Sequence, residues 1–199
     1  MILDTKYIDL FPVKISRVVL DLDHEAITNY TLDHREKHSW KDYTTFHDTK
    51  LNRNWMSGLP DKDKLDEAIN TAAIELCRQT DRKELTNPFT WYWVSIYDVF
   101  DAHGTHNHPG ALISGTYWPS ADGDSSPLFV EAPYDNHTMH DRLPKEALSY
   151  QYPPKTGDML VWPSWLKHRV VMQKEHKTPR IAISFNVDYD WATLRAKND

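Results

Sequence analysis

The nine residues from Arg180 to Asp188 alternate strictly between two kinds of side chain. One set is apolar and the other is small, polar or charged: Ile181, Ile183, Phe185 and Val187 against Arg180, Ala182, Ser184, Asn186 and Asp188. Successive side chains of a strand point to opposite faces, so this period of two predicts a β-strand. Taken alone, the alternation favours an antiparallel sheet with one face on a core and the other in water.

Two more segments have strand-like composition. Residues 111–118 are rich in β-branched and aromatic side chains and carry no charge, which favours an extended chain. Residues 159–162 form a short apolar run that follows a turn-forming Lys-Thr-Gly-Asp sequence. The C-terminal half of the chain is therefore expected to be a β-structure.

Three histidines lie at the ends of these segments. His106 and His108 precede the first run, and His168 follows the second. In an extended chain, residues i and i+2 share a face with α-carbons about 6–7 Å apart, so two such imidazoles can bind one ion at about 2.1 Å each. Because the chain has 11 histidines, a His-x-His pair also arises by chance, and the pair alone does not establish a metal site.

The order of motifs is more specific than any one of them. His-x-His-Pro is followed by Ser-Gly-x-Tyr-Trp, by Gly-Asp before the apolar run and Pro-Ser-Trp-Leu-x-His after it, and by Arg-x-x-x-Ser-Phe-Asn. This order resembles the non-haem iron, 2-oxoglutarate-dependent oxygenases, and among them a subfamily found in marine bacteria and their phages. The resemblance covers residues 88–188 and extends weakly to residues 9–12. It implies a mostly β (α+β) protein with a double-stranded β-helix, or jelly-roll, core and N-terminal supporting helices.

The resemblance also implies roles for individual residues. His106 and His168 match the two histidine ligands of the iron, and Arg180 matches the cation that binds the distal carboxylate of 2-oxoglutarate. Ser184 shares a strand face with Arg180, and a hydroxyl beside a guanidinium suits a carboxylate. Three more residues are expected to line the co-substrate pocket: Thr116, Trp118 and Tyr97. The implied cofactors are Fe(II), 2-oxoglutarate as co-substrate, and O2.

One position departs from the family pattern, in which Asp or Glu stands two residues after the first histidine. Here that position holds His108. In the first interpretation His108 is the third ligand of a three-histidine site. In the second, two histidines alone hold the iron and His108 lies beside them or at the substrate; in the third, a remote carboxylate such as Glu131 or Asp101 completes the site. We favour the first, because the i, i+2 spacing places His108 where the carboxylate normally reaches.

The activity implied by the resemblance is that of a dioxygenase, which oxidatively decarboxylates 2-oxoglutarate and hydroxylates a substrate C–H bond. The substrate is expected to be a small molecule or a protein side chain, and the fold does not choose between them. Two other classes fit part of the pattern. A three-histidine zinc hydrolase or hydratase would not need Arg180 and Ser184, and a non-catalytic jelly-roll binding module would leave the histidines without a role.

Composition limits the setting of this chemistry. The 199 residues, 40% hydrophobic, suit one domain over residues 1–199, with a support layer over about 1–87 and a barrel over about 88–190. A net charge of −6 gives no basic surface for nucleic acid. The single cysteine, Cys77, fits a reducing compartment and a buried position. With no signal-peptide pattern and no apolar run near 18 residues, we expect a cytoplasmic protein that does not enter a membrane. The sequence does not indicate an oligomeric state.

The first ninety residues are expected to be helical and irregular. Residues 61–80 form the clearest helix, with Asp61 or Asp63 as its cap and an apolar stripe made of Leu65, Ile69, Ala72, Ala73 and Leu76. Residues 24–60 show no clear period. Residues 131–152 are expected to form a long loop that acts as a lid or binding loop. The remaining histidines are expected to be solvated, with His103 near enough to the site to touch a ligand.

Overall fold

The computed structural model describes residues 12–37, 45–47, 55–80, 85–133, 149–174 and 177–189. Residues 9–11, most of the expected 131–152 loop, and His38, His137, His140 and His176 lie outside these ranges. The helical elements are α1 (His24–Lys37), the 3-10 helix η1 (Met56–Gly58) and α2 (Lys62–Gln79). The strands are β1 (Ser16–Val19), β2 (Thr45–His47), β3 (Pro88–Tyr97), β4 (His103–His106), β5 (Ile113–Ser120), β6 (Leu128–Glu131), β7 (Ser149–Tyr152), β8 (Asp158–Pro163), β9 (His168–Val170) and β10 (Arg180–Tyr189).

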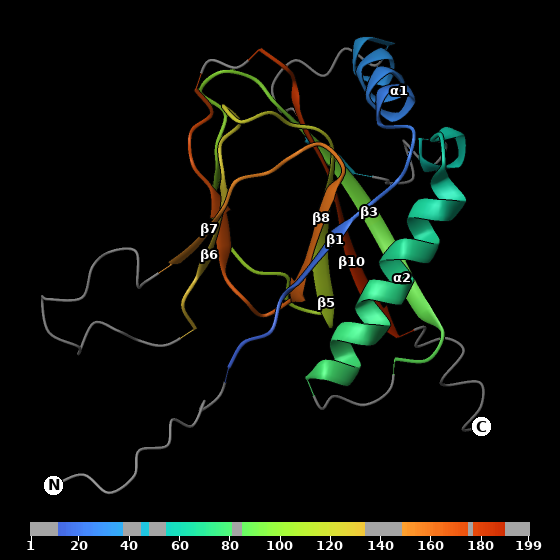
Figure 1. The fold of residues 1–199 in the computed structure, drawn as a ribbon, viewed down its shortest axis with the longest axis vertical. Coiled ribbons are helices and arrows are strands. Elements are labelled where there is room, and N and C mark those ends of the chain that lie inside the picture. The colour runs from blue at the N-terminus through green and yellow to red at the C-terminus, as the bar shows by residue number, and fades with distance from the viewer. Residues whose placement is uncertain are drawn as a thin grey trace, which may run out of the picture.

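The strands form two antiparallel sheets that face each other, as Figure 1 shows. The larger sheet has the strand order β1-β8-β5-β10-β3-β2, and the smaller one has the order β4-β9-β6-β7. From β3 to β10, successive strands lie in opposite sheets, except that β6 and β7 are neighbours in the smaller sheet. Strands that are distant in sequence are therefore neighbours within each sheet. The expectation of a mostly β architecture with N-terminal helices is therefore confirmed.

Both helices cover the outer face of the larger sheet (Figure 1). Helix α1 contacts β5, and α2 contacts β1 and β8. The expected stripe of α2 is buried, and Cys77 is buried beside it. These side chains pack with Ile181, Ile183, Phe185 and Val187 of β10 in one core cluster. Burial of this stripe, rather than helix propensity alone, accounts for the stability of the helix in this position.

The expected cap of α2 needs a correction. Asp61 is at the N-cap position, but its backbone is left-handed (φ 53°) and its side chain makes no capping hydrogen bond. Its carboxylate instead accepts a hydrogen bond from the backbone N–H of Asp23 (2.8 Å) and pairs with Lys64 (2.8 Å). Asp61 therefore ties the start of α2 to the segment before α1.

Strand β10 also differs from the half-solvated strand that its alternation favours. Its second set of side chains, Arg180, Ala182 and Asn186 among them, is buried, because the smaller sheet covers that face of the larger one.

The N-terminal region contributes strands as well as the expected support layer. Strands β1 and β2 are the two edges of the larger sheet, so the barrel includes residues from before position 88.

One glycine shows how tightly β5 and β10 approach each other. Gly115 lies opposite Phe185 in the strand register. A Cβ at this position would stand 2.2 Å from the Phe185 ring, which no side chain can tolerate. The glycine of the Ser-Gly-x-Tyr motif therefore makes room for a core aromatic ring.

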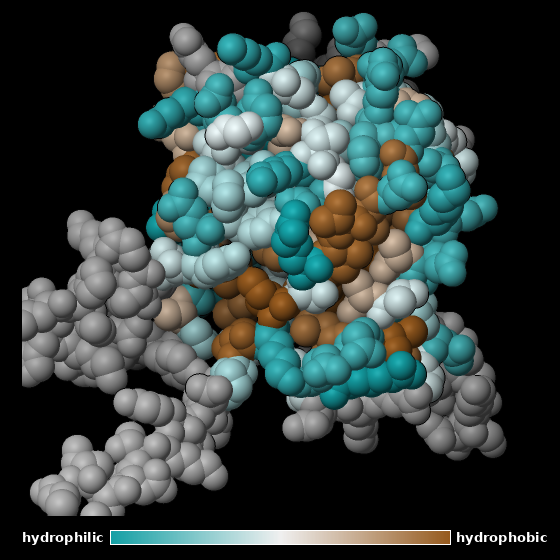
Figure 2. Space-filling view, in the orientation of Figure 1, coloured by the Kyte–Doolittle hydropathy of each residue, from teal (hydrophilic) through white to brown (hydrophobic). Residues whose placement is uncertain are grey.

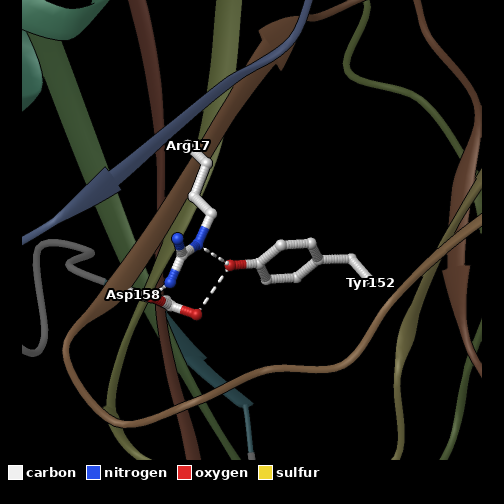
Figure 3. Close-up of polar contacts among 3 residues, drawn as sticks. All are labelled: Arg17, Tyr152 and Asp158. Atoms are coloured by element: carbon white, nitrogen blue, oxygen red, sulfur yellow. Dashed lines mark hydrogen bonds and ion pairs between the residues drawn. The ribbon is translucent and has the colours of Figure 1, made fainter.

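A polar cluster joins the two sheets at one edge (Figure 3). The Arg17 guanidinium of β1 donates to the Tyr152 hydroxyl (2.8 Å) and to the Asp158 carboxylate (2.6 Å). Tyr152 of β7 in turn donates to the other oxygen of Asp158 (2.6 Å). Burial, and then the hydrogen bond to Asp158, raise the pKa of Tyr152 to about 12. This cluster connects β7 of the smaller sheet to β1 and β8 of the larger one.

The face that includes β1 is mostly hydrophilic (Figure 2). Brown, hydrophobic surface gathers near the middle of this view, where Figure 1 places β1. Val19, the last residue of β1, is 64% exposed, as isolated apolar residues on a sheet edge often are. Among the described residues, no helix is both long and apolar enough to span a membrane.

Candidate metal centre and anion pocket

A cavity that is partly open to solvent lies between the two sheets. All eight residues selected from the sequence line it: His106, His108, His168, Arg180, Ser184, Thr116, Trp118 and Tyr97. The strand register explains why. Ser184 of β10 lies between Trp93 of β3 and Thr116 of β5, and Arg180 lies opposite Tyr97. Three residues from the second set of the β10 alternation therefore face the cavity: Arg180, Ala182 and Ser184.

The three histidines converge at one end of this cavity. His106 ends β4 and lies directly opposite His168, which begins β9. His108 follows two residues later, outside the strand. One nitrogen from each ring lies within 4.8 Å of the other two, and the Nε2 atoms of His108 and His168 are 3.2 Å apart. A separation near 3 Å is expected between neighbouring ligands that each lie about 2.1 Å from one ion.

Backbone carbonyls orient two of the three rings. The Nδ1 of His106 is 2.8 Å from the Gly104 carbonyl oxygen, and the Nδ1 of His168 is 3.0 Å from that of Leu166. A carbonyl oxygen only accepts, so both rings carry their proton on Nδ1 when neutral and leave Nε2 free for a metal. A hydrogen bond from the other ring nitrogen to a carbonyl oxygen is the usual support of a metal-binding histidine.

Burial also keeps two of the rings neutral. It lowers the pKa of His108 to about 4, with a smaller contribution from neighbouring histidines. It lowers the pKa of His168 to about 3, against a raising effect of the hydrogen bond to Leu166. Both imidazoles are therefore unprotonated near pH 7, as metal ligands must be.

The two remote carboxylates do not take part in this cluster. Glu131 accepts a hydrogen bond from Thr105 (2.9 Å) and lies 3.5 Å from Arg169. Asp101 accepts from the backbone N–H of Asp98 (2.8 Å). Among the described residues, the metal-ligand group consists of the three histidines alone, and neither Glu131 nor Asp101 belongs to it.

Arg180 lies elsewhere on the wall of the same cavity. Its side chain is 1% exposed, and its Nε donates to the Ser126 carbonyl (3.0 Å). The guanidinium carbon lies 4.1 Å from the centre of the Tyr97 ring, a cation–π contact. Burial lowers the pKa of Arg180, and Tyr97 partly opposes this effect.

No carboxylate balances this buried charge within the part of the chain that is described, and the Nη1 of Arg180 has no hydrogen-bond partner there. Arginine remains protonated in proteins, and an unpaired buried cation is costly. The pocket is therefore suited to an anion.

The other selected residues surround this pocket. Ser184 donates to the Thr116 hydroxyl (3.3 Å). Trp118 is fully buried and stacks on Tyr152 at 5.6 Å between ring centres, and its indole N–H has no partner in the described structure.

Two aromatic residues that were not selected from the sequence, Trp162 and Trp93, also line the cavity. Trp162 packs edge-on against His168 with ring centres 4.9 Å apart, and Trp93 lies 5.2 Å from His108. His103 stacks on His106 at 4.1 Å, so it touches the cluster as expected. Strand alternation was the available signal for Trp93, which shares a face with Tyr97 on β3.

Two histidines expected to be solvated are instead packed against aromatic rings. The Nδ1 of His24 is 2.6 Å from the Tyr117 hydroxyl, and His34 stacks on Tyr30. Neither belongs to the metal-ligand group found among the described residues. Both residues are half-buried, so they are less solvated than expected.

Fold and site together define a double-stranded β-helix protein with a three-histidine candidate metal centre beside an anion pocket. Residues 91–186, which contain all eight selected residues, match the family model described as "Putative 2OG-Fe(II) oxygenase". No curated protein sequence gives a significant match.

Solved structures with the same fold confirm the jelly-roll architecture. A Pseudomonas putida prolyl-4-hydroxylase has a TM-score of 0.58 at 11% identity, over 89% of this chain and 93% of that one. The alpha-ketoglutarate-dependent carbocyclase SnoK from nogalamycin biosynthesis has a TM-score of 0.61 at 9% identity, over 88% and 80% of the two chains. The epimerase SnoN from the same biosynthesis has a TM-score of 0.58 at 12% identity, over 89% and 79%. At these identities the similarity concerns the fold alone.

Proposed function

We propose that this protein is an Fe(II)- and 2-oxoglutarate-dependent oxygenase. One observation carries the proposal: three imidazoles converge in the same cavity as a buried guanidinium that has no acidic partner among the described residues. The first group suits a divalent metal and the second suits a carboxylate. A metal-bound keto acid with a second, distal carboxylate would use both.

The donor set supports iron. Three neutral nitrogen ligands from His106, His108 and His168 would occupy one side of the ion and leave further positions for a keto acid and O2. Imidazole also suits zinc, copper and nickel, so the ligands alone do not select the metal. The match of residues 91–186 to an iron oxygenase family favours Fe(II).

The anion pocket supports 2-oxoglutarate. Arg180 has a free Nη1 donor, and Ser184 and Thr116 add hydroxyls on the same wall of the cavity. A charge-assisted, paired contact with a carboxylate would satisfy the guanidinium. The Tyr97 ring packs against one face of the Arg180 guanidinium.

When bound, iron, 2-oxoglutarate and O2 supply oxidative decarboxylation of the keto acid coupled to oxidation of a substrate C–H bond. The residues of the chain supply the setting. Trp93 and Trp162 pack against His108 and His168 and would exclude water from the metal end, and Arg180 would neutralise the distal carboxylate. The carbonyls of Gly104 and Leu166 hold two ligand rings in orientation.

Hydroxylation of a small molecule or a protein side chain is the outcome that we propose, in a cytoplasmic setting and within the oxygenase subfamily of marine bacteria and phages. The net charge of −6 does not favour a nucleic-acid substrate. The descriptions of structures with the same fold name a hydroxylase, a carbocyclase and an epimerase, so the reaction outcome needs its own test.

The experiment is an anaerobic titration of the purified protein with Fe(II) and then 2-oxoglutarate. We expect a weak visible charge-transfer band that appears only with both, followed by succinate formation when O2 is admitted. The same titration with Zn(II) is the control for metal identity. Metal binding without any effect of 2-oxoglutarate would overturn the proposal and favour a zinc hydrolase or hydratase, and no metal binding would favour a binding module.

A further inference from the structure

A single turn contacts both segments that carry the histidines. This turn, residues 163–166, begins at the last residue of β8, and three consecutive carbonyl oxygens in it accept hydrogen bonds. Ser164 O accepts from the backbone N–H of His108 (3.0 Å), and Trp165 O accepts from the Asn107 side chain (3.3 Å). Leu166 O accepts from the Nδ1–H of His168 (3.0 Å). The position of the turn therefore affects His108 and His168 together.

A row of buried polar side chains crosses the larger sheet and ends at this turn. The Ser164 hydroxyl is 2.7 Å from the Ser114 hydroxyl of β5, which is 2.6 Å from the Asn186 amide of β10. The amide orientation that satisfies every partner has Nδ2 donating to Ser114 and to the Phe185 carbonyl (3.2 Å). Its Oδ1 then accepts from the indole N–H of Trp91 on β3 (3.2 Å).

The strand register fixes this row. Asn186 lies opposite Trp91 on one side and Ser114 on the other. Ser114 and Ser164 are fully buried and Asn186 is 6% exposed, so water does not compete for these hydrogen bonds. In such surroundings a lost partner leaves a polar group unsatisfied, and the remaining groups tend to move to recover a bond.

The resemblance gave no role to any of these three polar residues, although each lies in one of its motifs: Ser114 in Ser-Gly-x-Tyr, Ser164 in Pro-Ser-Trp-Leu-x-His and Asn186 in Ser-Phe-Asn. They meet in space although they are 50 and 72 residues apart along the chain. We propose that Ser114, Ser164 and Asn186 are positioning residues that fix the 163–166 turn and thereby hold His108 and His168 in the geometry that binds the metal. This inference rests on the proposed function, because it needs a metal at the three histidines.

The test measures metal affinity in the full-length chain with Co(II) alone, by visible absorption and calorimetry under anaerobic conditions. We expect a loss of Co(II) affinity of about tenfold in each of three variants: Ser164→Ala, Ser114→Ala and Asn186→Ala. This value is at the lower end of the loss that follows when a metal ligand loses its supporting hydrogen bond. The Co(II) absorption spectrum should change as well. In the double variant Ser114→Ala/Ser164→Ala the losses are expected to be less than additive, because both changes remove the same hydrogen bond.

Ser125→Ala is the matched control. Ser125 is also a buried serine (5% exposed), but its hydroxyl bonds to Asp122, in a turn that contributes nothing to the cavity wall. Its replacement is expected to leave the Co(II) spectrum and affinity unchanged. If an alanine variant does not fold, Ser164→Cys and Ser114→Cys keep nearly the same volume with a weaker donor and should give a smaller loss in the same direction.

A second measurement separates positioning from general damage. Arg180 is six residues from Asn186 along β10, about 20 Å at strand spacing. At saturating metal the 2-oxoglutarate requirement of the variants is therefore expected to stay within about twofold of the wild type. Variants with normal Co(II) spectra and affinity would overturn the inference while leaving the proposed function intact. Absence of Co(II) and Fe(II) binding in the wild-type protein would overturn both.

Discussion

At the scale of single residues, His108 sets the charge of the candidate metal centre. In the oxygenases that the chain resembles, a carboxylate at this position gives the protein ligands a charge of −1. Three imidazole ligands give no charge, because an imidazole binds a metal in its neutral form. The positive charge of a divalent ion would then be balanced by the keto acid. We therefore expect the binding of the co-substrate to depend more strongly on its negative charge here than in sites that have a carboxylate ligand.

Replacement of His108 tests whether it is a ligand. His108→Ala is expected to weaken Fe(II) binding by at least about tenfold, since one of three nitrogen donors is lost. His108→Asp restores the His-x-Asp pattern of the family and is expected to bind Fe(II) again. Anaerobic calorimetry measures both. Unchanged affinity in His108→Ala would instead place His108 beside the metal, as in the two-histidine interpretation.

Replacement of Arg180 tests the other end of the cavity. Arg180→Met removes the buried cation and is expected to cost about 3 kcal/mol of 2-oxoglutarate binding, on the order of a hundredfold in affinity. Fe(II) affinity should change little, because the guanidinium does not contact the histidines. Parallel titrations with metal and with 2-oxoglutarate measure the two effects. An equal loss of both affinities would contradict the assigned role.

At the scale of elements, the sequence predicts strands better than it predicts their surroundings. The alternation of 180–188 correctly predicts β10 and its two faces, and the apolar stripe correctly predicts α2. The same alternation does not tell a solvated face from a cavity wall. That difference depends on the smaller sheet, whose strands come from residues far away in the chain.

Short elements and loops were harder to predict, for a similar reason. Helix α1 was not assigned, because its apolar positions follow no clear stripe and its contacts with β5 stabilise it. His108 was expected within a strand, but β4 ends at His106, and the backbone bond to Ser164 places His108 instead. The motif order therefore selected residues that line one cavity, and tertiary contacts determine how they meet.

The link between β7 and the larger sheet gives a prediction at this scale. Tyr152→Phe removes the hydroxyl that joins Arg17 to Asp158 and leaves part of a buried carboxylate without its donor. We expect the free energy of unfolding to fall by about 1–2 kcal/mol in urea denaturation. Tyr150→Phe, on the same strand but 54% exposed, is the control and should change it little. Equal stability of the two variants would mean that the cluster does not hold the sheets together.

At the scale of the whole molecule, the neutral histidines link stability to pH. In the unfolded chain their pKa is near 6.5, whereas in the folded protein burial lowers it to about 4 for His108 and about 3 for His168. Below pH 6.5 the unfolded chain therefore binds protons that the folded protein does not, and protonation favours unfolding. The contribution of these two histidines to the free energy of unfolding of the metal-free protein should be complete above pH 6.5. It should decrease as the pH falls toward 4.

This prediction can be isolated from other acid-sensitive groups. Urea denaturation of the metal-free protein at pH 7 and pH 5 is expected to show a fall in unfolding free energy, of which about 2 kcal/mol comes from His168 alone. His168→Gln keeps the carboxylates, including Asp122, whose pKa is lowered by its hydrogen bonds, and should therefore show a smaller fall over the same interval. Addition of Co(II) should steepen the dependence in the wild type only, because protons and metal compete for the same nitrogens. The free energy of unfolding could instead fall by the same amount in wild type and variant between pH 7 and pH 5. In that case the fold does not keep the imidazole of His168 neutral, and burial does not explain why it would be unprotonated for metal binding.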